Sequence, residues 1–389
     1  MPLLYSKESE EQVMKKKMSM KVLATVLATM MIMSGCGTKE AAADAPIMVG
    51  TSFPLTGSVA ADGKLIVDAI QLAADQVNAE GGINGRKIEL VSEDDQATPA
   101  SSASIANKFS EDESILGVLT SYNSSCGFAQ VDVFKEAGLP AITPVCTNPG
   151  FTGLSDYWYR TCASDAYVGN LGADLCEKAG WKKVALLYEN DDYGLGIAEE
   201  YKARAAELGI EITTVQTFVY GETVDFSTVL TAVADSGAEG MFVCGLVTET
   251  GLLCEQKASY GCADVGVAGA DGLYSPALFE YGDAVEGVYT LGGFTAKNDT
   301  EVVKKFVEDY KAAYGEEPGN WAALAYDAAM TMFEAMKKVD GELTREKINE
   351  QLQTISYEGV TGTNKFIDGD VEKQYLYFIA KDGDWEIYE

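Results

Sequence analysis

The chain has 389 residues, with 29 basic and 60 acidic side chains and no histidine, so its formal net charge is −31. Such an excess of negative charge repels phosphate backbones and anionic lipid headgroups, which argues against nucleic acid as a partner. Hydrophobic residues make up 47% of the chain, enough for a sizeable core, and the length is typical of two domains.

The first predicted feature is an export signal that ends at a cysteine. Several lysines between residues 15 and 21 precede the apolar run Val22–Met33, and Met33-Ser34-Gly35-Cys36 follows. The apolar run is shorter than the roughly 20 residues that span a bilayer, as in a secretory signal. The last four residues resemble the lipobox of bacterial lipoproteins, whose cysteine receives diacylglycerol and becomes the new N-terminus.

These features predict a signal with lipobox over residues 1–36, lipidation at Cys36 and a tether over 37–46. Residues 1–13 are acidic and unlike the start of a signal, so a later methionine is an alternative start site. No second apolar run of membrane length follows Cys36. The lipid is therefore the only predicted membrane attachment, and we expect the body at the cell surface, on the outer face of a bacterial cytoplasmic membrane.

Cysteine usage says less about function. Seven cysteines follow Cys36, an odd number, and only Cys254 and Cys262 lie close enough in sequence to suggest a small loop. The absence of histidine and of any CxxC pair argues against a zinc site or a thioredoxin-like centre. We expect most of these cysteines to be small buried hydrophobic residues, and we predict no metal and no cofactor.

Strand and helix patterns alternate from residue 47 onward. The first set of predicted strands covers 47–53, 87–92, 115–120 and 141–143, with helices over 64–79, 101–110 and 128–137. The second set has strands over 183–188, 212–219, 240–245 and 265–268, with helices over 167–179, 196–208, 226–236 and 250–260. Helices over 301–313, 321–338 and 344–354 follow, and strands over 375–380 and 385–388 end the chain. This succession predicts an α/β protein of two doubly wound, parallel-sheet lobes.

Ligands of open α/β sheets bind beyond the carboxyl ends of the strands, so the residues just after each strand are candidate ligand contacts. The run 120–125 is rich in hydroxyls at the start of a helix, where unpaired N–H groups attract a carboxylate. Thr147 offers a second hydroxyl in a proline-stiffened turn, and Asp271 offers an acid for an ammonium group. Each has a structural alternative, because such residues commonly cap helices or form turns.

Five segments occur in an order that resembles a known family. They are Gly50-Thr51-Ser52-Phe53-Pro54-Leu55-Thr56-Gly57, Asn78-Ala79-Glu80-Gly81-Gly82-Ile83-Asn84-Gly85-Arg86-Lys87, Asp94-Asp95-Gln96, Gly138-Leu139-Pro140-Ala141-Ile142-Thr143-Pro144 and Asp192-Tyr193-Gly194. Together they resemble the branched-chain amino acid (leucine/isoleucine/valine) binding proteins of ABC transporters, over the chain from about residue 47 to 389.

The resemblance implies the type I periplasmic binding protein fold, a Venus-flytrap of two lobes joined by a three-strand hinge. Lobe 1 would comprise residues 47–164 plus 293–366, and lobe 2 residues 165–292 plus 367–389. The chain would cross between the lobes near 163–167, 291–295 and 366–369. A ligand that touches both lobes would favour their closed arrangement.

The resemblance also implies roles for individual residues. Ser121 would hold the carboxylate of an amino acid, together with the backbone of Val145 and Thr147. Tyr193 would reach across the cleft, and Asp271 would pair with the ammonium group, as an aspartate where leucine-binding members carry glutamate.

The sequence departs from the family where the side chain of the ligand should lie. Asp62 and Leu246 stand where aromatic residues are usual, while Tyr122 and Trp321 are available as other walls. Asp62 has two interpretations: an acid that faces a polar or cationic ligand, or a cap of the helix that follows it. The full predicted ligand-binding set is Ser121, Val145, Thr147, Tyr193, Asp271, Asp62, Tyr122, Leu246, Gly272 and Trp321.

The predicted function is that of an extracytoplasmic substrate-binding lipoprotein, a monomer that captures an amino acid and delivers it to an ABC permease. Branched-chain amino acids are the first candidates by resemblance; a polar amino acid or related amine is the alternative ligand. A ligand-sensing subunit of a signalling system is the alternative role, because fold does not fix function. An enzyme is not expected, since the chain lacks a Ser-His pairing and a glycine-rich phosphate loop.

Overall fold

The computed structural model describes residues 45–389, of which 46–389 form one compact unit. The predicted signal, Cys36 and nearly all of the tether lie outside the described residues. Within residues 45–389, no helix combines the length and the apolar character needed to cross a membrane.

The first sheet has five strands in the order β2-β1-β3-β4-β5, and every neighbouring pair is parallel. Its strands are β1 (Ile47–Phe53), β2 (Ile88–Asp94), β3 (Ile115–Thr120), β4 (Ala141–Thr143) and β5 (Trp158–Arg160). The interior strands β1, β3 and β4 are almost wholly buried, which explains why they read as near-continuous apolar runs.

The second sheet has seven strands in the order β14-β13-β10-β9-β8-β6-β7. Five are mutually parallel: β6 (Lys183–Glu189), β7 (Glu211–Phe218), β8 (Gly240–Cys244), β9 (Gly266–Gly269) and β10 (Tyr289–Gly292). The C-terminal strands β13 (Leu376–Lys381) and β14 (Asp384–Ile387) add an antiparallel edge. We call the parts built on the two sheets the first and the second lobe; a short hairpin, β11 (Tyr357–Gly359) with β12 (Gly362–Asn364), forms a third, separate sheet.

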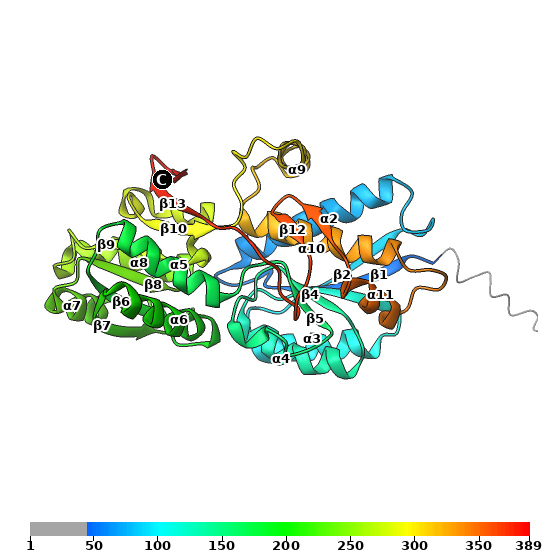
Figure 1. The fold of residues 1–389 in the computed structure, drawn as a ribbon, viewed down its shortest axis with the longest axis horizontal. Coiled ribbons are helices and arrows are strands. Elements are labelled where there is room, and N and C mark those ends of the chain that lie inside the picture. Colours follow the sequence, from blue (N-terminus) through cyan, green and yellow to red (C-terminus); the bar gives the residue numbers. More distant parts are fainter. Residues whose placement is uncertain (1–44) are drawn as a thin grey trace, which may run out of the picture. The chain divides into compact units, whose positions relative to one another are not determined.

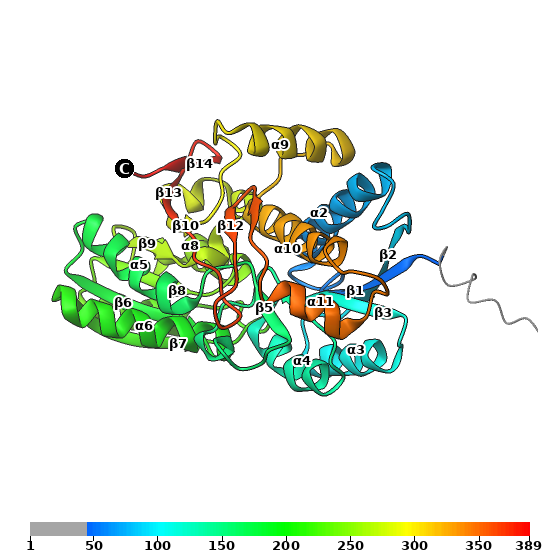
Figure 2. The same cartoon turned by 45° about the vertical axis from the view of Figure 1, so that its right-hand side comes forward.

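Helices from distant parts of the sequence cover the first sheet. They are α2 (Ala60–Ala79), α3 (Pro99–Glu111) and α4 (Ser124–Glu136), joined by α9 (Glu301–Tyr314), α10 (Asn320–Lys337) and α11 (Arg345–Leu352) from late in the chain. Helix α10 packs along α2 and lies beside it in both views, orange against blue (Figures 1 and 2). Its strongly buried sequence, from Asn320 to Met336, shows that it lies in the core of this lobe.

The second lobe is covered by one helix that precedes β6 and by three helices that directly follow β6, β7 and β8. They are α5 (Asp165–Lys178), α6 (Asp192–Leu208), α7 (Ser227–Ser236) and α8 (Val247–Gln256). Four 3-10 segments complete the chain: η1 (Pro149–Phe151) in the first lobe, and η2 (Lys257–Tyr260), η3 (Asp271–Leu273) and η4 (Pro276–Val285) in the second. In Figure 1 this lobe is the green and yellow half, with red β13 at its edge.

The chain passes between the sheets three times, after β5, after β10 and after β12, and the two sheets are doubly wound and mostly parallel. The predicted α/β fold class is therefore confirmed. The lobe boundaries at residues 164, 292 and 366 stay predictions.

Several helices begin earlier than the sequence pattern predicts. Helix α4 begins at Ser124 rather than near 128, and α6 at Asp192 rather than near 196. Their first turns contain glycine, serine and aspartate, which lack helical apolar spacing, so the pattern becomes visible only one turn later. The short strands β5, β10, β11 and β12 were not predicted, because three or four residues carry too little periodicity.

The cysteines of the described chain are all buried free thiols, as expected. Cys254 and Cys262 form no disulfide, so the small loop considered from sequence does not exist. Burial raises the pKa of the Cys254 thiol to about 12, which keeps it protonated and unreactive.

Candidate functional site

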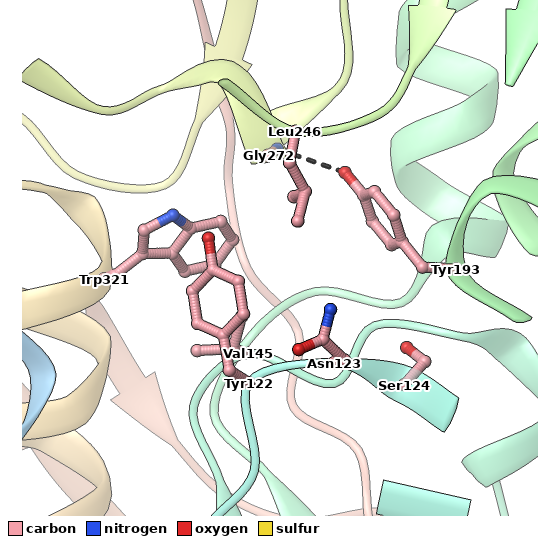
Figure 3. A pocket seen from close by; sticks show the side chains of 8 residues that line it. All are labelled: Tyr122, Asn123, Ser124, Val145, Tyr193, Leu246, Gly272 and Trp321. Carbon is pink, nitrogen blue, oxygen red and sulfur yellow. Dashed lines mark hydrogen bonds between the residues drawn. The ribbon is translucent and has the colours of Figure 1, made fainter. Parts of the chain in front are cut away.

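A small cavity of about 20 Å³ lies at the carboxyl ends of strands from both sheets. Figure 3 shows that side chains of the two lobes face each other across it. It is lined by Tyr122, Asn123, Ser124, Val145, Tyr193, Leu246, Gly272 and Trp321. Six of the predicted residues are among these: Tyr122, Val145, Tyr193, Leu246, Gly272 and Trp321.

The first lobe contributes one wall through two strand ends and a helix. Tyr122, Asn123 and Ser124 connect β3 to α4, and Val145 follows β4. Trp321 is the second residue of α10, a helix contributed from late in the chain. Because parallel strands end at the same edge of a sheet, these distant segments meet at one place.

Ser121 is predicted to hold a carboxylate, but it is Ser124 that lines the cavity. The Ser121 hydroxyl is buried and donates to the carbonyl oxygen of Asn123 at 3.5 Å. Ser124 opens α4, whose N-cap residue, Asn123, makes no side-chain capping bond. Sequence reasoning did not single out Ser124 because the helix was placed one turn too late.

A buried arginine fixes the loop after β4. The Arg160 guanidinium donates to the carbonyl oxygens of Thr147 at 2.7 Å and Asn148 at 2.9 Å. It also makes a two-pronged ion pair with Asp370, at 2.6 and 2.7 Å, in the last crossing between the lobes. The turn that carries Val145 and Thr147 is therefore tied to the hinge region.

The opposite wall belongs to the second lobe, where Tyr193, Gly272 and Asp271 form a connected group. The amide of Gly272 donates to the Tyr193 hydroxyl at 3.2 Å, drawn as a dashed line in Figure 3, and that hydroxyl lies 3.4 Å from Asp271 Oδ1. A β-carbon on Gly272 would lie 2.5 Å from the Tyr193 oxygen, so only glycine fits there.

Asp271 lies behind this wall, fully buried, and does not line the cavity itself. Its second oxygen accepts a hydrogen bond from Tyr375 at 3.2 Å. Burial raises the pKa of Asp271 to about 7, although the hydrogen bonds from Tyr375 and Tyr193 oppose the shift. The alternative of a helix cap is wrong, because Ser275 caps the following segment.

Asp165, the first residue of α5, is a second buried carboxylate and was not predicted. Both of its oxygens are buried without a hydrogen-bond partner, and so is the hydroxyl of Thr147. The Asp165 amide donates to the Thr147 carbonyl at 2.8 Å, so the two residues are neighbours. Burial first, and then the charge of Asp271, raises the pKa of Asp165 well above its usual value.

Nothing in the sequence distinguishes Asp165 from an ordinary acid in the first turn of a helix. Its significance comes from the fold, which places it beside Thr147 and within electrostatic reach of Asp271. Neither carboxylate forms an ion pair within residues 45–389, since Arg160, the cation within electrostatic reach of Asp165, pairs with Asp370. Two such buried acids indicate a place where a positive group binds.

Asp62 has a role that neither sequence interpretation anticipated. It lies inside α2, whose N-cap is Val59, and it does not line the cavity. Its carboxylate accepts hydrogen bonds from Tyr122 of its own lobe and from Ser275 of the second lobe, both at 2.9 Å. The cap interpretation is therefore wrong, and Asp62 links the lobes while it fixes the Tyr122 ring.

Glu189, at the end of β6, positions another wall residue. Its Oε1 accepts from the amide of Leu246 at 2.9 Å, and its Oε2 is buried without a partner. Burial and the nearby Asp191 raise the pKa of Glu189 well above its usual value. The raised pKa favours the neutral form of this acid, which is the less costly form to bury behind Leu246.

Known proteins resemble this chain in sequence and in structure. The family model described as "Periplasmic binding protein" matches residues 46–383. The Leu/Ile/Val-binding protein homolog 2 of Brucella abortus is 35% identical over 298 residues, 75% of this chain and 78% of its own length. The leucine-, isoleucine-, valine-, threonine- and alanine-binding protein of Pseudomonas aeruginosa is 28% identical over 94% of this chain and 95% of its own.

Among solved structures, the branched-chain amino acid transporter substrate binding protein LivJ of Streptococcus pneumoniae, in complex with isoleucine, superposes with a TM-score of 0.81. It is 29% identical, and the match covers 88% of this chain and 99% of that protein. The likeness therefore extends over both lobes.

Proposed function

The chain belongs to the periplasmic binding protein family, and on that premise we propose that it captures a zwitterionic amino acid between its lobes and delivers it to an ABC permease. It is a binding protein and not an enzyme, like the other members of its family and its structural neighbours. The observation that carries the proposal is the pair Asp165 and Asp271, two buried carboxylates that lack a cation partner, beside a cavity whose other wall is a helix N-terminus.

The start of α4 suits the carboxylate of the ligand. Its first N–H groups point out of the helix, its N-cap side chain makes no capping bond, and the Ser124 hydroxyl lines the cavity. The positive end of the helix dipole adds to the attraction of an anion. Ser124 thus takes the role that the resemblance assigns to Ser121.

The ammonium group would lie by Asp165, Thr147 and Asp271. An ammonium has three donors, and this corner offers the unpaired oxygens of Asp165 and the unpaired hydroxyl of Thr147. The positive charge would also offset the repulsion between the two carboxylates. Charge-assisted hydrogen bonds contribute about 1.5–3 kcal/mol each, which makes micromolar or tighter binding attainable.

Closure of the lobes follows from this division of the ligand's contacts. Ser124 and Thr147 belong to the first lobe, whereas Asp165, Tyr193 and Asp271 belong to the second. A cavity of about 20 Å³ holds roughly one water, so an amino acid enters only when the lobes separate. A ligand that bridges both walls then favours the closed arrangement through its differential contacts.

Branched-chain amino acids are the first candidates. Val145, Leu246 and the rings of Tyr122 and Trp321 give the cavity apolar walls for an aliphatic side chain. The named ligands of the Brucella relative and of the Streptococcus structure agree with this choice.

We further propose that the protein works as a monomer, lipid-anchored through Cys36 on the outer face of the cytoplasmic membrane. The signal layout before Cys36 supports the anchor, and the permease follows from the transporter named for the Streptococcus structure.

Titration calorimetry with the twenty amino acids tests the proposal on the chain from residue 37 onward, which contains the whole compact unit 46–389. Bound ligand is first removed by unfolding and refolding. We expect saturable binding of at least one neutral amino acid, and a fall in that affinity of roughly 10- to 100-fold in Asp165→Asn. If no amino acid binds to protein that has refolded with native circular dichroism, the proposed function is wrong.

A further inference from the structure

We propose that Asn123 selects, among amino acids, those whose side chains carry an uncharged hydrogen-bonding group, a hydroxyl or an amide, over aliphatic side chains of the same shape. The inference rests on the proposed capture of an amino acid. It departs from the branched-chain candidates given above, because it ranks the polar amino acid first among those of equal shape.

Asn123 presents an unpaired carboxamide to the cavity. The residue is 8% exposed, it lines the cavity, and its Oδ1 is buried without a hydrogen-bond partner. It is the N-cap residue of α4, but its side chain makes no capping hydrogen bond and therefore does not stabilise the start of the helix. Figure 3 shows its side-chain amide directed into the space between Tyr193, Leu246 and Tyr122, with the nitrogen pointing into that space.

Such a group discriminates between ligands through the cost of leaving it unpaired. An aliphatic side chain packed against the carboxamide would remove it from water and return no hydrogen bond. A hydroxyl or amide group at the same place would donate to Asn123 Oδ1 or accept from its nitrogen. Sites built around a buried polar group therefore reject analogues that lack its partner.

The proposal above already assigns the other polar groups to the common parts of an amino acid. The helix start at Ser124, which lines the cavity, takes the carboxylate, and the neighbouring residues Asp165 and Thr147, outside the lining, take the ammonium. Asn123 is adjacent to Tyr122, a wall residue whose hydroxyl is engaged by Asp62. The carboxamide is thus the polar group left for the variable part of the ligand.

Charge disfavours an acidic side chain. No lysine or arginine is among the residues that line the cavity, and the buried carboxylates Asp165 and Asp271 would repel a second anion. Asp62, the acid bound to the Tyr122 hydroxyl, lies outside the cavity lining and already accepts from two hydroxyls, so it is not placed to pair with a cationic side chain. Neutral polar side chains remain.

Two pairs of amino acids with nearly equal shape test the inference: threonine against valine, and asparagine against leucine. Dissociation constants are measured by calorimetry for the protein from residue 37 onward and for Asn123→Leu. In the unsubstituted protein we expect the polar member of at least one pair to bind about tenfold more tightly or better. In Asn123→Leu we expect that ratio to fall to near one or to reverse.

Asn123→Leu removes no hydrogen bond, so the variant should fold, and thermal unfolding checks this. Ser125→Ala, one residue further along α4 and outside the cavity lining, is the matched control and should keep the ratio. The inference is overturned if the aliphatic member of both pairs binds as tightly as the polar member. It is also overturned if Asn123→Leu weakens both members of a pair equally, which would place the carboxamide on the common carboxylate.

Failure of the proposed function looks different. If none of the four amino acids nor any other of the twenty binds to the unsubstituted protein, amino acid capture itself is wrong. If amino acids bind but the pairs show no preference, only the role of Asn123 is wrong.

Discussion

Unpaired polar groups mark the individual residues that matter at the cavity. Asp165, Thr147 and Asn123 each have a buried polar atom without a partner in the described chain. Most buried polar groups of folded proteins are paired, so three exceptions at one place are informative. They cost stability in the protein alone, and in the proposed complex the ligand would satisfy them.

Asp165→Asn should therefore change affinity and stability in opposite directions. We expect the affinity for an amino acid to fall roughly 10- to 100-fold, because a charge-assisted hydrogen bond to the ammonium is lost. At pH 8 we expect the ligand-free variant to be more stable by about 1 kcal/mol, since a buried, unpaired charge is removed. Calorimetric titration and chemical denaturation measure the two effects.

Asp95→Asn is the matched control, because Asp95 is also buried but accepts hydrogen bonds from Ala97 and Ser102 away from the cavity lining. It should leave the affinity unchanged. An Asp165→Asn protein that binds its ligand normally would exclude Asp165 from the ammonium site.

Contacts between elements of different lobes hold the cavity shut. Asp62 on α2 accepts from Ser275, which precedes η4, and Ser58 donates to Tyr220 beyond β7 at 3.0 Å. The side-chain amide of Asn148, just before η1, donates to the backbone carbonyl of Asp192 at the start of α6. A β-carbon on Gly196 of α6 would lie 2.7 Å from the same amide, so α6 needs glycine for this approach.

Ser275→Ala should shift the lobes toward the open arrangement. The substitution leaves Asp62 with an unpaired oxygen only when the lobes are closed, which costs the closed form about 1–3 kcal/mol. We expect ligand affinity to fall about 5- to 150-fold, because binding must supply that difference. Small-angle scattering should show a larger radius of gyration at a fixed, subsaturating ligand concentration.

Tyr220→Phe provides the comparison, since it removes an exposed cross-lobe hydrogen bond of little net value. Its effect on affinity should be several-fold smaller. Equal effects of the two substitutions would mean that burial of the Asp62 contact has no importance for closure.

At the scale of the whole molecule, burial of acids between the lobes links proton binding to stability and to ligand binding. The pKa of Asp271 rises from 3.8 to about 7, and that of Asp165 rises as well. The folded, ligand-free protein therefore binds more protons than the unfolded chain between pH 4 and 7. Stability must then fall as pH rises through this range.

Ligand affinity should follow the opposite course. An ammonium group binds the ionised carboxylates, so we expect affinity to increase between about pH 6 and pH 8, by up to roughly tenfold per pH unit below the pKa. Calorimetry across this range measures affinity, and denaturation without ligand measures stability. In Asp271→Asn the loss of stability with rising pH should become shallower; an affinity that is constant from pH 6 to 8 would contradict the role of these carboxylates.

Sequence reasoning alone predicts the fold class and six of the eight residues that line the cavity. Buried parallel strands read as apolar runs and amphipathic helices show a clear period, so β1, β3 and α2 could be predicted. The positions after strands, together with the family resemblance, led to Val145, Tyr193 and Leu246, because topology fixes which strand ends meet.

Only the tertiary structure decided which polar residues face the ligand. Ser121 and Ser124 look alike in sequence, and the true start of α4 separates them. In the sequence, Asp165 resembles any acid in a first helical turn, and Asp62 resembles a helix cap. In the folded protein the Asp165 carboxylate is buried and unpaired, and Asp62 accepts a hydrogen bond from Ser275 of the second lobe. Local patterns record periodicity and propensity, whereas burial, pairing and charge repulsion depend on residues that are distant in the chain.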